Sequence, residues 1–144
     1  MSIEILFRGK RTDNGEWVEG SYLPDGITGK CYIVPTGSCL NESEKVGEDG
    51  CLQFFAFEID PSTICQYTGL TDKNGRKIWE NDILRCKDGS ILKVSWHHFK
   101  ASWVVSKKGW IYNHFFGEGV EPEDVEVIGN IFDTPELLEV ADEI

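Results

Sequence analysis

Residues 66–85 read QYTGLTDKNGRKIWENDILR, and this stretch decides the predicted fold. Its pattern is that of a strand, a hairpin turn at Asn74-Gly75 and the start of a second strand. Asn and Gly adopt the positive φ of tight hairpin turns at little steric cost. Asp82 follows the turn, and we expect its carboxylate to accept hydrogen bonds from nearby backbone amides. The stretch therefore predicts an antiparallel hairpin.

The same turn chemistry recurs along the chain, and short segments of alternating hydrophobicity lie between the turns. Further turn signals are Asp13-Asn14-Gly15, Asp25-Gly26, Asp49-Gly50, Asp88-Gly89 and Lys108-Gly109. Apolar side chains alternate with polar ones over residues 3–8, 92–97 and 101–106. In the first of these segments, Ile5 and Phe7 share the face that we expect to be buried. Period-two alternation is typical of half-buried antiparallel strands, so we predict a mainly-β protein.

Two regions differ from this β pattern. Residues 41–50 are polar and lack apolar periodicity, which predicts an exposed loop. Near the C-terminus, Thr134-Pro135-Glu136 predicts the start of a short helix, with Thr134 as its N-cap and proline at the first helical position. We expect an N-terminal β region over residues 1–65 and a second region over residues 66–144, with one continuous domain as the alternative.

The composition excludes several classes of protein. The chain has 144 residues, of which 40% are hydrophobic and 27% charged, so it can bury a core. No apolar run approaches the ~20 residues that span a bilayer, and the N-terminus lacks the pattern of a signal peptide. We therefore expect a cytoplasmic protein that does not bind membranes. The formal net charge of −11 argues against a general nucleic-acid coat protein.

The cysteines and histidines form no pattern typical of a metal or catalytic site. The five cysteines are widely spaced without a CxxC pair, whereas structural zinc sites use such short spacings. A disulfide framework is not expected without a secretory signal. A nucleophilic pair of Cys86 with His97 has no local support in the sequence. We predict free thiols, no metal, no cofactor and no catalytic residue.

The stretch at residues 66–85 resembles the signature of the YopX family of phage and prophage proteins, QYTGL-(K/T)DKNG-(K/R)-I-(Y/W)-E-x-D-I-(V/L). Residues 7–10 and 15–20 are similar to the family's opening, and residues 127–138 are similar to its closing motif. The resemblance therefore covers most of the chain. Two departures are mild: Asn81 stands where the family more often has glycine, and Trp79 replaces a common tyrosine.

The resemblance implies a mostly-β protein of the bacterial host cell whose C-terminal part is an SH3-like barrel. It implies no established activity, cofactor or catalytic residue, and a fold alone does not assign a function. The signature residues have structural uses as well as a binding use. Gly69 and Gly75 suit special backbone angles, and Asp82 suits the turn. The large apolar residues suit the core: Tyr67, Ile78 and Trp79.

The charge is distributed unevenly, and this layout gives a candidate binding region. Residues 70–108 hold nine basic and four acidic residues, whereas no Lys or Arg follows Lys108. Aromatic rings beside cationic side chains hold single-stranded nucleic acid without sequence preference. The candidate nucleic-acid-binding residues are Lys73, Arg76, Lys77, Trp79 and Arg85, with Trp96 and Trp103 in the same region. We expect the acidic C-terminal segment to pair with these basic hairpins, in its own chain or in a neighbouring subunit.

We expect a non-enzymatic binding or regulatory module that contacts a host or phage protein, and three alternatives stay open. The first is an acidic inhibitor of a host protein, whose carboxylates occupy a groove built for phosphates. The second is a weak single-stranded nucleic-acid binder through residues 70–108. The third is a homo-oligomer, because residues 110–116 place aromatic side chains on both faces of one predicted strand. An enzyme is not favoured, since the sequence contains no phosphate loop or nucleophile motif.

Overall fold

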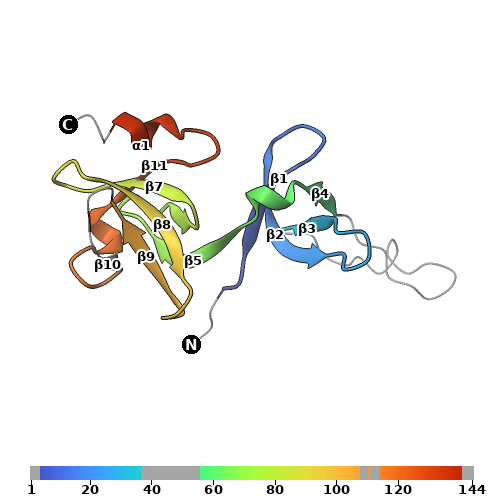
Figure 1. Ribbon diagram of the computed structural model, residues 1–144, viewed down its shortest axis with the longest axis horizontal. Helices are drawn as coiled ribbons and strands as arrows, with labels where there is room; N and C mark the ends of the chain where they lie inside the picture. The colour runs from blue at the N-terminus through green and yellow to red at the C-terminus, as the bar shows by residue number, and fades with distance from the viewer. Residues whose placement is uncertain (1–3, 37–55, 108–109, 111–113, 141–144) are drawn as a thin grey trace, which may run out of the picture. The chain divides into compact units, whose positions relative to one another are not determined.

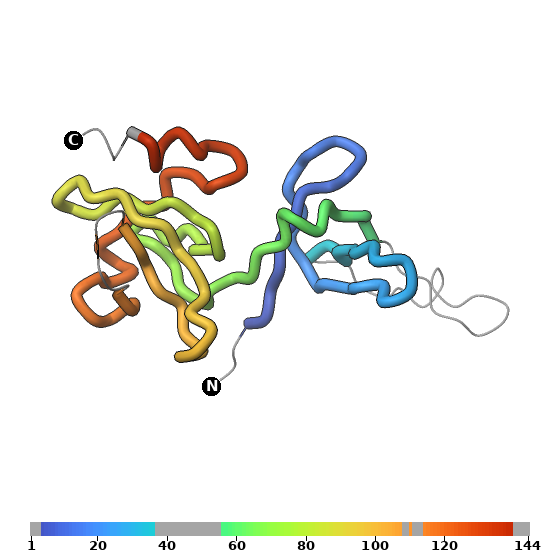
Figure 2. Tube along the Cα trace, in the orientation of Figure 1, coloured from blue at the N-terminus to red at the C-terminus, as the bar shows by residue number. Residues whose placement is uncertain are grey.

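The computed structural model describes residues 4–36, 56–107, 110 and 114–140. The chain contains two compact units, an N-terminal unit of Glu4–Gln66 and a C-terminal unit that includes Tyr67–Ile144. Figure 2 follows the chain through both of them. Each unit has a hydrophobic core of its own and is described separately. The loop predicted at residues 41–50 lies outside the described residues.

The N-terminal unit is a small antiparallel sheet (Figure 1). Its strands lie in the spatial order β4-β3-β2-β1, with the bounds β1 Phe7–Lys10, β2 Trp17–Pro24, β3 Cys31–Pro35 and β4 Phe57–Ile59. A 3-10 turn, η1 (Pro61–Thr63), leads into β5 (Cys65–Thr71), whose first two residues pair with β1. Cys31, Ile33 and Ile59 form the core, with exposed fractions of 3% or less.

The predicted burial of Ile5 is wrong. Its side chain is 70% exposed, whereas the neighbouring Leu6 is 6% exposed. The strand begins only at Phe7, so the residues before it lie outside the pleat that alternation describes. Phe7 itself is half-buried and packs on Tyr22, with ring centroids 5.4 Å apart.

The C-terminal unit is built from consecutive antiparallel hairpins. The later part of β5 pairs with β6 (Lys77–Trp79). A five-stranded sheet has the order β10-β9-β8-β7-β11, with the bounds β7 Asp82–Arg85, β8 Ile91–His97, β9 Ser102–Ser106, β10 His114–Phe115 and β11 Glu126–Asn130. A second 3-10 turn, η2 (Pro122–Asp124), precedes β11. Its core includes Ile78, Leu84, Leu92, Val94, Val105, Val125 and Val127.

The predicted short C-terminal helix is present as α1 (Glu136–Val140). The carbonyl oxygen of Thr134 accepts a hydrogen bond of 3.1 Å from the N–H of Leu137, in the first turn of that helix. Thr134 Oγ1 accepts a hydrogen bond from the N–H of Asn130 at 3.1 Å, which holds the turn between β11 and the helix. The prediction of a mainly-β, antiparallel fold with one short helix is confirmed. None of the helices in the described ranges is both long and apolar enough to cross a membrane.

Candidate functional site

Two buried carboxylates organise the backbone of the stretch at residues 66–85. Asp82 is 1% exposed, and its Oδ2 accepts a hydrogen bond from the N–H of Trp79 at 2.8 Å, as the sequence predicted. Asp72 is 5% exposed and was missed by the sequence analysis. Its carboxylate accepts three backbone hydrogen bonds of 2.9 Å, from Asn74, Arg76 and Val127. The structural uses of this stretch are therefore realised in the fold.

The hydrogen bonds to Asp72 keep its carboxyl ionised. Burial by itself would raise the pKa of Asp72, but the N–H groups of Val127, Arg76 and Asn74 hold that pKa below its ordinary value. A carboxylate that accepts several backbone N–H groups is stabilised in its charged form. Asp72 therefore acts as a fixed anion inside the turn and has a structural role.

Trp79 is part of the core and cannot stack on a base. It is 3% exposed and lies beside Tyr67, with ring centroids 5.6 Å apart. A side chain this buried offers no exposed ring face to a base, which argues against the stacking role predicted for Trp79. The candidate was chosen because Trp79 is an aromatic residue among basic residues in the sequence. A tryptophan that lies in the core of a basic hairpin gives the same pattern.

The basic candidates lie largely against the acidic end of their own chain. Lys73 Nζ and Arg85 Nη2 lie 3.8 Å and 2.7 Å from Glu126 Oε2 on β11. Lys87, in the turn after β7, forms a similar pair of 2.9 Å with Asp124. The acidic C-terminal segment therefore pairs with the basic hairpins within the chain, which is one of the two arrangements expected from the sequence.

The remaining two candidates have different surroundings. Arg76 Nη1 donates a long hydrogen bond of 3.4 Å to the carbonyl oxygen of Val127. Lys77 Nζ lies 5.9 Å from the ring centre of Tyr67. The fold thus gathers Lys73, Arg76 and Arg85 beside β11 and leaves Lys77 beside an aromatic ring. The carboxylate of Glu126 offsets part of the positive charge of Lys73 and Arg85.

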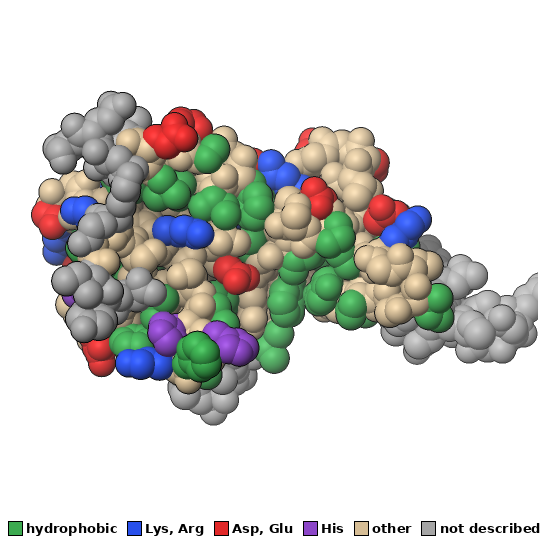
Figure 3. All heavy atoms as spheres, in the orientation of Figure 1, with side chains coloured by type: hydrophobic (Ala, Val, Ile, Leu, Met, Phe, Trp, Pro, Cys, Tyr) green, Lys and Arg blue, Asp and Glu red, His purple; other side chains and the backbone are tan. Residues whose placement is uncertain are grey.

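Exposed aromatic side chains of the C-terminal unit gather instead at the turn between β8 and β9. We call this the hairpin tip, defined as Trp96, His97, His98, Phe99 and Lys100. Phe99 is 93% exposed and Trp96 is 44% exposed. The N–H of Lys100 donates to Nδ1 of His97 at 3.2 Å, which closes the turn. Figure 3 shows histidine, hydrophobic and basic side chains together at this end of the unit.

The hairpin tip stands on a packed base. Trp96 pairs across the strands with Trp103, with ring centroids 4.9 Å apart in an edge-to-face arrangement, and Trp103 packs on the core. On the other side of the hairpin, Lys100 Nζ lies 5.2 Å from the ring centre of Phe115. Residues 89–117 contain no Asp or Glu. The tip therefore presents rings and cations on a segment without carboxylates.

Two thiols of the described residues, those of Cys31 and Cys86, are not activated nucleophiles. Cys31, Cys65 and Cys86 are free, and burial raises the pKa of Cys31 and of Cys86. A thiol with a raised pKa stays protonated at neutral pH and reacts slowly. In the part of the chain that the structure covers, His, Cys, Asp and Glu form no group of three or more that could hold a metal ion.

The strand predicted from residue 110 to residue 116 is seen in part. β10 covers His114 and Phe115, and residues 111–113 lie outside the described residues. Self-association through this strand stays a prediction.

Comparison with known proteins places the chain in a sequence family and a fold. The family model described as YopX protein matches residues 6–139. The crystal structure of protein EF1440 from Enterococcus faecalis is similar to this chain, with a TM-score of 0.51 and 24% identity over 95% of this chain and 99% of that chain. At that identity the likeness shows the fold alone. No curated protein matches the chain.

Proposed function

This chain belongs to the YopX protein family, and from that premise we propose that it is a non-enzymatic binding module that holds single-stranded nucleic acid weakly at the hairpin tip. The observation that carries the proposal is the exposure of Phe99, which is 93% exposed and lies next to Lys100 and the two histidines in the hairpin tip. Aromatic rings on which bases stack, next to cations that meet phosphates, are how single strands are held without sequence preference.

The charge distribution favours the hairpin tip over the basic residues near the Asn74-Gly75 turn. Lys73 and Arg85 already face Glu126, so a phosphate there would displace an existing ion pair. Lys93 and Lys100 lie on β8 and at its end, in the segment without Asp or Glu. Among the described residues neither of these lysines has an ion-pair partner. Their charge is available to a phosphate.

The small number of exposed rings and available lysines predicts that single strands bind weakly. Base stacking on an aromatic side chain contributes about 1–3 kcal/mol per base, and the tip offers two exposed rings, Trp96 and Phe99. Two stacked bases contribute about 2–6 kcal/mol together, which corresponds to a dissociation constant between about 30 mM and about 0.04 mM. Lys100 at the tip and Lys93 further along β8 together correspond to a slope of log K against log salt of about −1.4 for a single strand.

Fluorescence anisotropy of a labelled oligothymidylate tests the proposal. Phe99→Ala should weaken binding at low salt by about fivefold or more, because one stacking surface is lost. Ile27→Ala is the matched control, since Ile27 is 96% exposed in the N-terminal unit and should not matter. Equal affinities of the wild-type protein and Phe99→Ala, or the absence of binding at low salt, would overturn the proposal.

We also propose that the C-terminal unit is an SH3-like barrel and that the protein acts in the bacterial cytoplasm. The barrel is supported by the consecutive order β7-β8-β9-β10 and by the return of β11 beside β7. In the described ranges, no strand pairing joins β10 to β11.

A further inference from the structure

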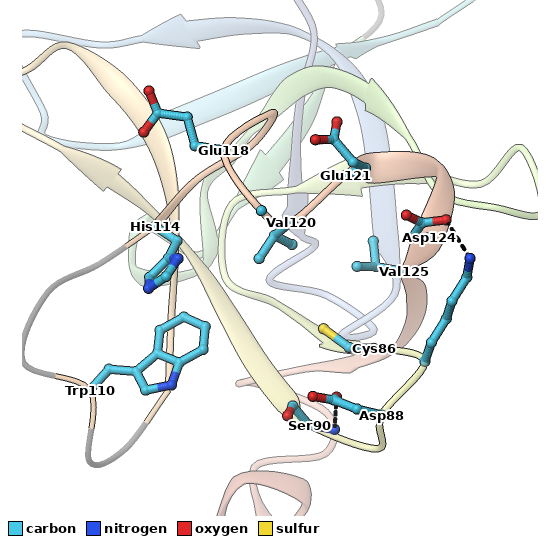
Figure 4. Close-up of a pocket in the computed structure, with 12 residues that line it drawn as sticks. Cys86, Asp88, Ser90, Trp110, His114, Glu118, Val120, Glu121, Asp124 and Val125 are labelled. Atoms are coloured by element: carbon cyan, nitrogen blue, oxygen red, sulfur yellow. Dashed lines mark hydrogen bonds and ion pairs between the residues drawn. The ribbon is translucent and has the colours of Figure 1, made fainter.

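A pocket of about 440 Å³ lies in the C-terminal unit and is separate from the groups used in the proposed function. Its inner surface is mostly apolar, with contributions from Cys86, Val120 and Val125. One wall is formed by Trp110 and His114, whose rings stack with centroids 4.3 Å apart at an angle of 39°. Figure 4 shows these five side chains around one space.

The rim of the pocket is anionic. Asp88, Glu118, Glu121 and Asp124 line it, and Lys87 is the one Lys or Arg among the described lining residues. Lys87 is itself bound to Asp124 at 2.9 Å, and Asp88 accepts a hydrogen bond of 2.9 Å from the N–H of Ser90. Figure 4 places Glu118 and Glu121 on the side of the pocket away from Asp88. Glu118 and Glu121 have no ion pair with another described residue.

The Cys86 thiol in the interior of the pocket carries no charge at neutral pH. Burial raises the pKa of Cys86, the nearby Asp88 raises it further and Lys107 opposes them, with a net increase. The thiol is therefore protonated and behaves as a small apolar group. Lys107 donates to Ser90 Oγ at 3.4 Å and is the cation next to Asp88. An apolar interior inside a carboxylate rim selects ligands by both shape and charge.

We propose that this pocket binds an apolar group that carries a positive charge at its periphery, such as an aromatic amine or a hydrophobic peptide side chain flanked by basic residues. The apolar body packs on Val120, Val125 and the Trp110 ring, and the cation lies beside Glu118 and Glu121. A cation close to the face of an aromatic ring gains a further attraction from the ring. A fully inserted Lys side chain fits less well, because its ammonium group would lie at the apolar floor.

Three probes with one phenyl ring and different charge test the proposal: phenethylammonium, 2-phenylethanol and 3-phenylpropionate. The readout is the NMR signal of the Trp110 indole N–H, assigned by its loss in Trp110→Phe. The cation should bind about threefold or more tightly than the alcohol, and the anion should bind least. Equal binding of all three probes, or no saturable shift of the Trp110 signal, would overturn the proposal.

A matched pair of double variants locates the charge effect. Glu118→Gln with Glu121→Gln should remove most of the preference for the cation. Glu136→Gln with Glu139→Gln changes the net charge equally on exposed residues of α1 and should leave that preference unchanged. If both double variants lose the preference for the cationic probe, that preference does not come from Glu118 and Glu121, and the proposal is contradicted. The peptide acetyl-Phe-Lys-amide carries one positive charge, as phenethylammonium does, and separates the two sources: tighter binding than phenethylammonium supports a protein ligand, and equal or weaker binding supports a small amine.

Discussion

The carboxylate of Asp72 accepts a hydrogen bond of 2.9 Å from the backbone N–H of Val127, which lies 55 positions further along the chain. The same carboxylate accepts from the N–H groups of Asn74 and Arg76 in its own turn. One buried side chain thus ties the turn at Asn74-Gly75 to β11. This contact explains why the family signature and the C-terminal strand belong to one structural unit.

Asp72→Ala should destabilise the C-terminal unit by about 2–4 kcal/mol, because buried N–H groups lose their acceptor. Asp88→Ala is the control, since Asp88 is exposed and accepts from the single N–H of Ser90 in a similar turn. That control should lose about 1 kcal/mol or less. Urea unfolding followed by tryptophan fluorescence measures both variants. Similar losses in the two variants would contradict the role given to Asp72.

The low pKa of Asp72 predicts a dependence of stability on pH. Burial acts to raise this pKa, but the N–H groups of Val127, Arg76 and Asn74 outweigh it, so the folded pKa lies below the unfolded one. The resulting stability is fully present above the unfolded value of about 3.9 and is lost as the pH falls through the folded pKa. The difference in unfolding free energy between the wild-type protein and Asp72→Asn should therefore shrink below about pH 4. If this difference in unfolding free energy stays constant within experimental error from pH 6 down into the acid range, the predicted role of the Asp72 charge is contradicted.

Gly20 of β2 is required by a close backbone approach in the N-terminal unit. A Cβ at this position would collide with the carbonyl oxygen of Val34 on the paired strand β3. Gly20→Ala should therefore destabilise the unit by about 2–3 kcal/mol. Gly26→Ala is the control, because a Cβ there meets no atom within 4 Å and the backbone φ is not positive. Thermal unfolding should show a lower melting temperature for Gly20→Ala and little change in melting temperature for Gly26→Ala.

Glu126→Gln separates the two locations considered for nucleic acid. The change releases Arg85 and Lys73 from their ion pairs with Glu126. If single strands bind at the hairpin tip, the affinity for oligothymidylate should change by less than about twofold, apart from the small effect of one net charge. A marked increase in affinity would locate binding at Lys73, Arg76 and Arg85. The stability should change by about 1 kcal/mol or less, because the pairs are partly exposed.

Local patterns in the sequence predicted strands β8 and β9 and several turns correctly. Asn-Gly and Asp-Gly pairs mark turns because their backbone angles are local properties, and Leu92 and Val94 are buried as alternation requires. Asp82 was predicted as a turn acceptor because Trp79, its partner, is three positions away. The partner of Asp72 on β11 is not local, so no sequence window contained it.

The hairpin tip was missed as a turn for a related reason. Its turn contains neither Gly nor Asn, and Ala101 adopts a positive φ of 47° that the sequence does not announce. The alternation from residue 101 suggested a strand there, whereas β9 begins at Ser102. From the sequence, Trp79 and Trp96 cannot be told apart, because each is an aromatic residue near lysines. Only the packing of Trp79 against Tyr67 shows which of the two is covered.

An NMR titration of the isotopically labelled protein with oligothymidylate at low salt is the sharpest test of nucleic-acid binding at the hairpin tip, because it locates the contact as well as detecting it. We predict saturable shifts at the amides of the hairpin tip, at the indole N–H of Trp96 and at Phe115. The amides of residues 72–85 should shift little. Saturable shifts confined to residues 72–85, or no saturable shift at any residue, would contradict the account.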